Sequence, residues 1–279
     1  MQKVKLTLAI SWAILSCTQV QAQPVNSVLL EPRPTSNPNR QPNELLTFAA
    51  PPPPPDIGEP GQRAEAGSRG CQALRAGKRE RGKGERGTPW INPGAWNKDK
   101  PLTSSQKPLL ALMPVYSDSE LVLGTTIAPT PTFWFYIPYQ PPSSGKFVLR
   151  DKNGKLLYHT DVTLPQTPGV VSLSLPKAVA PLEIGKQYHW FLKIYCKPQE
   201  PPAYVEGWIQ RNPLNPVLNS QLQKATPRDR VALYAANGIW FEALTTASVL
   251  RHRDPKDTTW AELLRTIGLN DLATEPIIK

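Results

Sequence analysis

The side chains that most often carry catalysis are few in this sequence and lie far apart. A metal site needs several converging ligands, and the three histidines do not cluster along the chain: His159, His189 and His252. The sequence lacks G-x-S-x-G, HExxH and CxxC motifs, and no glycine-rich phosphate loop opens a helix. We therefore predict no catalytic residue, no metal site and no cofactor.

Carboxylates offer the one enzymatic alternative. Asp118 with Glu120, or Glu206 with Glu242, could act as the acid and base of glycoside hydrolysis. That chemistry requires two carboxyl groups separated by roughly 5 to 9 Å, and spacing in the sequence does not fix this separation. A carbohydrate-active or cell-wall hydrolytic enzyme is therefore retained as an alternative to a non-catalytic protein.

The N-terminus has the three parts of a secretory signal peptide. Lys3 and Lys5 are followed by the apolar run 6–15 and by the small-residue site Val20-Gln21-Ala22. The apolar run is shorter than the roughly 20 residues that cross a bilayer. Residues 1–22 are therefore predicted to direct export to the periplasm or cell surface, and no transmembrane span is predicted in the mature protein.

A second interpretation of the same segment is lipidation. Ile14-Leu15-Ser16-Cys17 resembles a bacterial lipobox, in which the cysteine becomes the acylated first residue. The chain would then be a lipoprotein subunit of an envelope assembly, tethered at Cys17 instead of released after Ala22.

Export also bears on the other two cysteines. Once the signal peptide is removed, Cys71 and Cys196 remain as an even pair in an oxidising compartment. A disulfide between them is the default prediction, with two separate buried thiols as the alternative. A bridge would tie the segment around Cys71 to the folded domain and would leave neither sulfur free as a nucleophile.

Half of the formal net charge of +10 is concentrated in residues 63–86, which carry eight basic and three acidic side chains. In a cytosolic protein this basic tract would suggest nucleic acid, but export argues against that partner. Two interpretations remain: a tract that attracts an anionic envelope polymer or a protein partner, and a linker that its charges keep solvated. The oligomeric state is left open.

Composition divides the chain into regions. Eleven of the 33 prolines lie between Pro24 and Pro60, which favours extended polyproline II over a packed core. We therefore predict a disordered linker over 23–107. Short segments rich in β-branched and aromatic residues predict a mainly β domain over 108–212. Helical periodicity predicts a small C-terminal helical segment over 213–279, packed on the β domain.

Two local signals give the β domain a more specific fold. Asn153-Gly154 between apolar runs predicts a β-hairpin with a type I′ turn. Leu182, Gly185 and Tyr188 resemble the tyrosine corner of immunoglobulin-like domains, in which the tyrosine hydroxyl bonds back to the backbone. The predicted fold is an immunoglobulin or fibronectin type III-like β-sandwich, with alternate residues from Tyr188 to Cys196 in its core.

One predicted strand is apolar on both faces, in the segment Thr132 to Tyr139 (TFWFYIPY), so a second layer must cover it. The C-terminal helices are one candidate for that layer, through Trp240 and Trp260. The other interpretation is an exposed platform on which sugar rings or a partner stack. The residues that would form this aromatic binding surface are Trp134, Tyr136 and Trp208.

Cap residues delimit three helices in the C-terminal segment. Thr226-Pro227 is a typical N-cap with proline at the first helical position, and Asn237-Gly238 is a stop signal. A second helix is predicted from Ile239 to about Arg251, and a third from Thr259 to Gly268.

Four strings stand out together by their order and spacing: Pro131 to Tyr136 (PTFWFY), Thr167 to Pro176 (TPGVVSLSLP), Val205 to Ile209 (VEGWI) and Asn237 to Thr245 (NGIWFEALT). They resemble the cyanobacterial family called domain of unknown function 928 over roughly residues 105–275. The Arg/Gly segment ending in Cys71 also looks typical of that family, and Phe241-Glu242 stands where Tyr-Asp is expected. The resemblance implies an exported protein of a Gram-negative-type envelope and carries no known active site.

Together these patterns predict an exported, envelope-associated interaction protein without catalytic activity. The sequence does not identify its ligand.

Overall fold

The computed structural model describes residues 46–58, 60–65, 71, 107–140 and 143–278. The predicted signal peptide 1–22 with Cys17, the proline-rich residues 23–45, and residues 66–70 and 72–86 of the basic tract lie outside the described residues.

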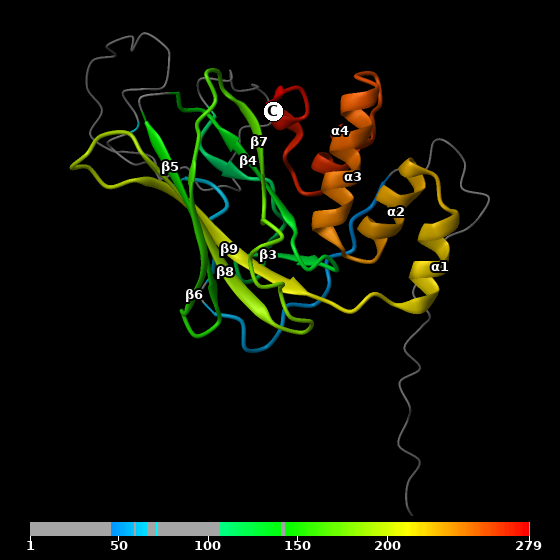
Figure 1. The fold of residues 1–279 in the computed structure, drawn as a ribbon. Helices are drawn as coiled ribbons and strands as arrows, with labels where there is room; N and C mark the ends of the chain where they lie inside the picture. The colour runs from blue at the N-terminus through cyan, green and yellow to red at the C-terminus, as the bar shows by residue number, and fades with distance from the viewer. Residues whose placement is uncertain (1–45, 59, 66–70, 72–106, 141–142, 279) are drawn as a thin grey trace, which may run out of the picture. The chain divides into compact units, whose positions relative to one another are not determined.

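Two mixed β-sheets form the body of the structure (Figure 1). The smaller sheet has the order β1-β4-β7-β10. Its strands are β1 (Leu110–Ala111), β4 (Thr132–Ile137), β7 (Gly169–Ser174) and β10 (Ile277–Ile278). The larger sheet has the order β2-β3-β9-β8-β5-β6. Its strands are β2 (Val115–Tyr116), β3 (Leu121–Thr126), β5 (Ser144–Asp151), β6 (Leu156–Val162), β8 (Gln187–Tyr195) and β9 (Ala203–Arg211). Neighbours are antiparallel, apart from the parallel pairs β3–β9 and β7–β10.

Aromatic side chains join the two sheets. Period-two alternation turns Phe133 of β4 toward the larger sheet, where its ring lies 4.9 Å from Phe147 of β5 and 6.1 Å from Trp190 of β8. Phe135 lies 5.6 Å from the same tryptophan. Along β8 the predicted alternation is confirmed, because the residues buried on one face are Tyr188, Trp190, Leu192 and Ile194. The mainly β prediction is therefore confirmed at the level of two packed sheets.

Four helices follow β9, and they are α1 (Pro216–Lys224), α2 (Pro227–Ala236), α3 (Trp240–Arg253) and α4 (Thr259–Thr266). The Thr226 hydroxyl accepts a hydrogen bond from the backbone N–H of Asp229, as its predicted N-cap role requires. Helix α1 was not predicted separately. Its N-cap is Asn215, whose side chain accepts from the backbone N–H groups of Val217 and Leu218.

Helices α3 and α4 cover the second face of β4. Trp134 makes an edge contact with Trp260, and its indole N–H donates to Thr245 Oγ1 at 3.2 Å. The Trp240 indole N–H donates to the backbone oxygen of Leu112 at 2.8 Å. The helices thus form the layer that an apolar two-faced strand requires.

The C-terminus returns to the sheets after the 3-10 helix η3 (Asn270–Leu272). Strand β10 adds to β7, so the smaller sheet includes residues from the segment predicted to be helical. The Lys107 ammonium forms a buried ion pair with Glu275 and also donates to the backbone oxygen of Asp271 at 2.6 Å. Because buried charges need partners, this pair fixes the start of the β region to the C-terminal end.

Residues 46–58 and 60–65, which we call the strap, lie within the predicted linker 23–107 but pack on the two sheets and on helix α2. The backbone N–H of Ala49 donates to the Ala235 oxygen at 3.0 Å, and the Tyr116 hydroxyl donates to the Pro51 oxygen at 2.5 Å. Burial raises the pKa of Tyr116 to about 12. Further along, Gln62 bridges to Glu206 of β9. Extended proline-rich chain has free carbonyl groups, so it can bond along sheet edges without regular structure of its own.

The predicted disulfide is present between Cys71 and Cys196, whose Cα atoms are 5.2 Å apart. Cys196 directly follows β8, and Cys71 is 1% exposed. The bridge therefore holds the chain beyond the strap against the end of a central strand.

The predicted β5–β6 hairpin is present, but its turn is not type I′. Gly154 has φ +84°, whereas Asn153 is not among the residues with positive φ, which both central residues of a type I′ turn require. The Gly154 N–H donates to the Asp151 oxygen, and Asp151 Oδ1 accepts from the N–H groups of Asn153 and Lys155. The aspartate side chain thus supports a longer turn with the glycine in the left-handed position.

The predicted tyrosine corner has the expected bond. The Tyr188 hydroxyl accepts from the backbone N–H of Glu183 at 2.8 Å, Leu182 is fully buried and Gly185 has φ +79°. These contacts fix the chain where it enters β8.

Replacing both Cys71 and Cys196 by serine is expected to lower the free energy of unfolding by about 2–5 kcal/mol, because the bridge closes a loop across a sequence separation of 125 residues. Urea denaturation with and without a reducing agent measures the effect. The double variant should not respond to the reductant, whereas wild type should fall to the stability of the variant. Two titratable thiols in oxidised, denatured wild type would contradict the bridge.

Candidate functional site

The outer face of the larger sheet carries a regular grid of side chains that point away from the core. In this grid Lys146 of β5 lies directly opposite Lys193 of β8, and Lys193 lies opposite Tyr204 of β9. In the next row Val148 lies opposite Phe191, and Phe191 lies opposite Glu206. Antiparallel partners share a face, so side chains from three strands meet on one surface.

Five of these residues define what we call the cationic-aromatic face: Lys146, Arg150, Phe191, Lys193 and Tyr204. The Arg150 guanidinium lies 5.7 Å from the centre of the Phe191 ring, and the Lys193 ammonium lies 5.5 Å from it. Phe191 is half-buried and Tyr204 is 37% exposed. Within the described ranges, none of the three cations forms an ion pair with a carboxylate. The face therefore combines ring surface with positive charge that no partner neutralises there.

A histidine and a glutamate border this face. The His189 ring stacks on Trp208 at 4.3 Å with an interplanar angle of 10°, and its other neighbour is Phe191 at 4.2 Å. His189 Nε2 lies 3.1 Å from Glu206 Oε2, and both side chains are 20% exposed. Glu206 and His189 therefore lie side by side at the edge of the face.

The three aromatic residues predicted to form a binding platform are buried: Trp134, Tyr136 and Trp208. The helices cover Trp134, and the strap covers Trp208. At Gly58 of the strap a Cβ atom would stand 2.5 Å from the Trp208 ring, so only glycine permits this close approach. The structure corrects the predicted platform, because its members are core residues, and it brings Phe191 and Tyr204 to the surface instead.

The structure describes residues 63–65 and 71 of the basic tract 63–86. The first cation of the tract, Arg63, has a structural role. Arg63 Nη1 donates to the backbone oxygen of Ile267 at 2.9 Å, at the C-terminal end of α4. Burial lowers the pKa of Arg63. A cation at a helix C-terminus is favourable, so Arg63 stabilises the fold and is not free to bind an external anion.

The carboxylates considered for hydrolysis have different surroundings. Asp118 and Glu120 lie exposed in the turn between β2 and β3. Glu206 pairs with His189, whereas Glu242 bonds to the chain at the end of β3. The two glutamates therefore have separate partners.

Glu242, in the first turn of α3, fixes that helix to the larger sheet. Its Oε1 atom accepts from the Thr126 hydroxyl at 2.6 Å and from the backbone N–H groups of Ile127 and Ala128 at 3.1 and 2.9 Å. Its Oε2 atom is buried and has no hydrogen-bond partner in the described part of the chain. Burial is the largest influence on this carboxyl group and raises its pKa, against the hydrogen bonds that lower it.

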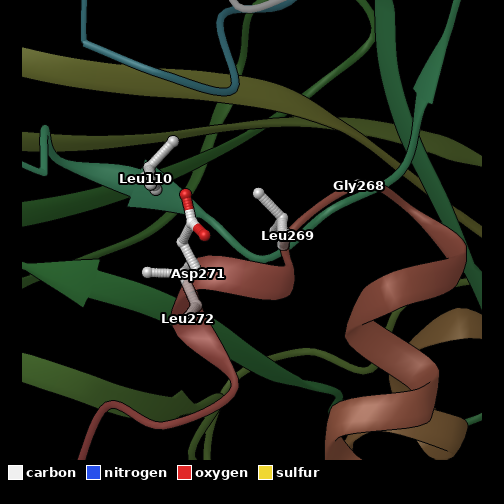
Figure 2. Close-up of a pocket in the computed structure, with 5 residues that line it drawn as sticks. All are labelled: Leu110, Gly268, Leu269, Asp271 and Leu272. Atoms are coloured by element: carbon white, nitrogen blue, oxygen red, sulfur yellow. The ribbon is translucent and has the colours of Figure 1, made fainter. Parts of the chain in front are cut away.

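Other chemistry-bearing groups do not converge. His159 and His252 are exposed on β6 and α3, and no group of three His, Cys, Asp or Glu residues able to hold a metal occurs among the described residues. A small pocket beside η3 is lined by Leu110, Gly268, Leu269, Asp271 and Leu272. Figure 2 shows the Asp271 carboxylate between Leu110 and Leu269. With one carboxylate and apolar neighbours, this pocket offers no acid–base pair.

Among the residues that the structure describes, none of the helices has the length and apolar character that a membrane crossing requires.

Comparison with protein families matches residues 81–277 to the family described as Domain of Unknown Function (DUF928). The chain belongs to the DUF928 family. A comparison with curated proteins finds no match.

The cationic-aromatic face lies wholly within the DUF928 region, on β5, β8 and β9. The strap and Cys71 precede that region, whereas Cys196 lies inside it. The disulfide therefore joins a segment before the DUF928 region to a central strand of the DUF928 fold.

The Glu242→Gln variant of this DUF928 chain is expected to change how stability depends on pH. The raised pKa means that the fold favours the protonated carboxyl group, so its stabilising effect is complete below about pH 4.5 and is lost as pH rises through the folded-state pKa. Glutamine stays neutral, so the melting temperature of the variant should fall less than that of wild type between about pH 4 and pH 8.

Glu120→Gln, which removes an exposed carboxylate from the β2–β3 turn, is the matched control and should follow wild type at each pH. Parallel curves for wild type and Glu242→Gln would refute the raised pKa.

Proposed function

We propose that this DUF928 chain is an exported, envelope-associated binding protein without catalytic activity. The observation that carries the proposal is the cationic-aromatic face, where three cations surround ring surface from two strands. Charged side chains without internal partners contribute little to folding, whereas they favour association with a partner of opposite charge.

Export to the periplasm or cell surface is supported by two independent features. Residues 1–22 have the order of parts of a signal peptide, and the Cys71–Cys196 bridge is the kind of bond that persists in oxidising compartments. Tethering through an acylated Cys17 is the lipoprotein form of the same proposal.

The strand order supports an immunoglobulin-like sandwich. Strands β1-β4-β7 face β3-β9-β8-β5-β6, with a parallel β3–β9 pair and a tyrosine corner before β8. Sandwiches of this kind host many unrelated functions. The proposed binding function therefore rests on the cationic-aromatic face and not on the fold.

The surroundings of the acidic side chains support a non-catalytic role. Glu242 accepts three hydrogen bonds at a helix–sheet junction, Glu275 pairs with Lys107, and Glu206 pairs with His189. Glu242 and Glu275 thus contribute to structure, and Glu206 lies beside a histidine, whereas hydrolysis of a glycoside needs two carboxylates that converge on one bond.

Binding to the envelope is expected to depend on the three cations. The mature protein should sediment with a washed envelope fraction of its source cells, and Lys146→Ala, Arg150→Ala and Lys193→Ala combined should abolish most of this binding. About 1 M salt should also release the protein, because the screening length falls to about 3 Å.

The matched control removes three exposed lysines elsewhere, Lys177→Ala, Lys186→Ala and Lys256→Ala. It should bind as wild type does. Equal loss in both triple variants would mean that net charge acts without a defined face, and no loss in either would reject the face as the binding site.

Mass spectrometry of the protein purified from its source cells tests export and the form of the N-terminus. A mature chain that begins at Gln23 is expected, and an acylated Cys17 would establish the lipoprotein form. An intact Met1 in the cell-associated protein would contradict export.

A further inference from the structure

We propose that the cationic-aromatic face binds an acidic polysaccharide, a chain of sugar rings that bear carboxylate or sulfate groups. The proposal rests on the proposed binding function and adds the chemical class of the ligand. Its first basis is the pairing of Lys146 with Lys193. These lysines are directly opposite in the β5–β8 register, and like charges at such positions oppose folding.

Asp161 of β6 lies opposite Lys146 on its other side, but the two form no ion pair in the described residues. The unfavourable lysine pair therefore remains without an internal carboxylate between its members. An anionic group from a ligand above the sheet would remove the repulsion and gain charge-assisted hydrogen bonds to both ammonium groups.

The second basis is the ring surface beside these charges. Phe191 carries Arg150 and Lys193 over its ring, and such cation–π contacts are weak at half-exposed sites. Both cations can therefore turn to a ligand anion at little cost and uncover the part of the ring that His189 does not contact. The C–H face of a sugar ring is apolar and packs on aromatic surface, which Phe191 and the exposed Tyr204 provide.

The spacing of the charges favours a polymer over a compact anion. Lys146, Lys193 and Tyr204 lie in one row across three strands, so the row spans about 10 Å, and Arg150 lies two rows away along its strand. A single phosphate group prefers a concave site with converging backbone N–H groups, and none converge on a sheet face whose backbone is paired. Repeated charges along a sugar chain match separated cations better.

Glu206 limits the site on one side. It lies opposite Phe191 and 3.1 Å from His189, and its carboxylate would repel an acidic ligand. The ligand therefore lies over β5 and β8. On β9 it reaches Tyr204 but not Glu206. Replacing Glu206 by glutamine removes the repulsion and is expected to strengthen binding by about two- to threefold.

The test uses the mature full-length protein and calorimetric titration with polygalacturonate and dextran sulfate, with neutral dextran as the uncharged probe. Wild type should bind an acidic polymer and not dextran. Lys146→Ala with Lys193→Ala should weaken binding about tenfold or more. Phe191→Leu should also weaken it while it preserves the melting temperature, and Lys177→Ala with Lys256→Ala is the matched control, expected to stay within about twofold of wild type.

Wild-type affinity in the Lys146/Lys193 variant would overturn the proposal, even if polyanions bind elsewhere on the chain. Equal binding of neutral dextran would overturn it as well. If no acidic polymer binds but envelope sedimentation still requires the cations, this inference fails and the proposed function stands. If protease treatment of the envelope abolishes that sedimentation, the partner is a protein and the inference also fails. If neither assay depends on the face, both proposals fail.

Discussion

Strand β4 is apolar on both faces, and the arrangement of the other layers depends on this property. Phe133 and Phe135 face the larger sheet, whereas Trp134 faces helices α3 and α4. A strand of this kind loses stability wherever either face meets water, because each large side chain gains roughly 1.5–3 kcal/mol from burial. Strand β4 therefore lies between the larger sheet and the helices, and the C-terminal helices are a required layer of the fold.

This layering determines where a binding surface can lie. Helices α3 and α4 cover β4 of the smaller sheet, whereas Ser172 and Ser174 of its neighbour β7 are exposed. The outer face of the larger sheet, which has six strands, is the broader sheet surface. The strap covers the part of that surface over β3 and β9, where Ile57 packs with Leu121, Leu123 and Trp208. The part over β5 and β8 carries Arg150, Phe191 and Lys193 instead. The apolar half of the outer face is thus buried by the chain itself, and the charged half is the half available to a partner.

Predictions from the sequence succeeded where the signal was local. The corner from Leu182 to Tyr188, the β5–β6 hairpin, the N-cap at Thr226 and the alternation along β8 each depend on residues close together in sequence. The turn type was wrong, because the Asp151 carboxylate bonds to two backbone N–H groups and stabilises another turn. The platform was wrong because the sequence does not specify which layer covers Trp134 or that Gly58 approaches Trp208.

The cationic-aromatic face and the strap escaped prediction for a related reason, since both depend on register between distant segments. Alternation assigns Lys193 to the outer side of β8, but only the β5–β8 pairing brings Lys146 beside it. Likewise, the proline content of the strap predicts an extended chain but does not specify what that chain packs against.

The bridge from Cys71 to Cys196 closes next to the end of β8, the strand that carries Phe191 and Lys193. The register of β5, β8 and β9 does not depend on that bridge, because their ladders do not involve it. The disulfide therefore fixes Cys71 to the end of β8, whereas the geometry of the charged half depends on the pairing of the strands.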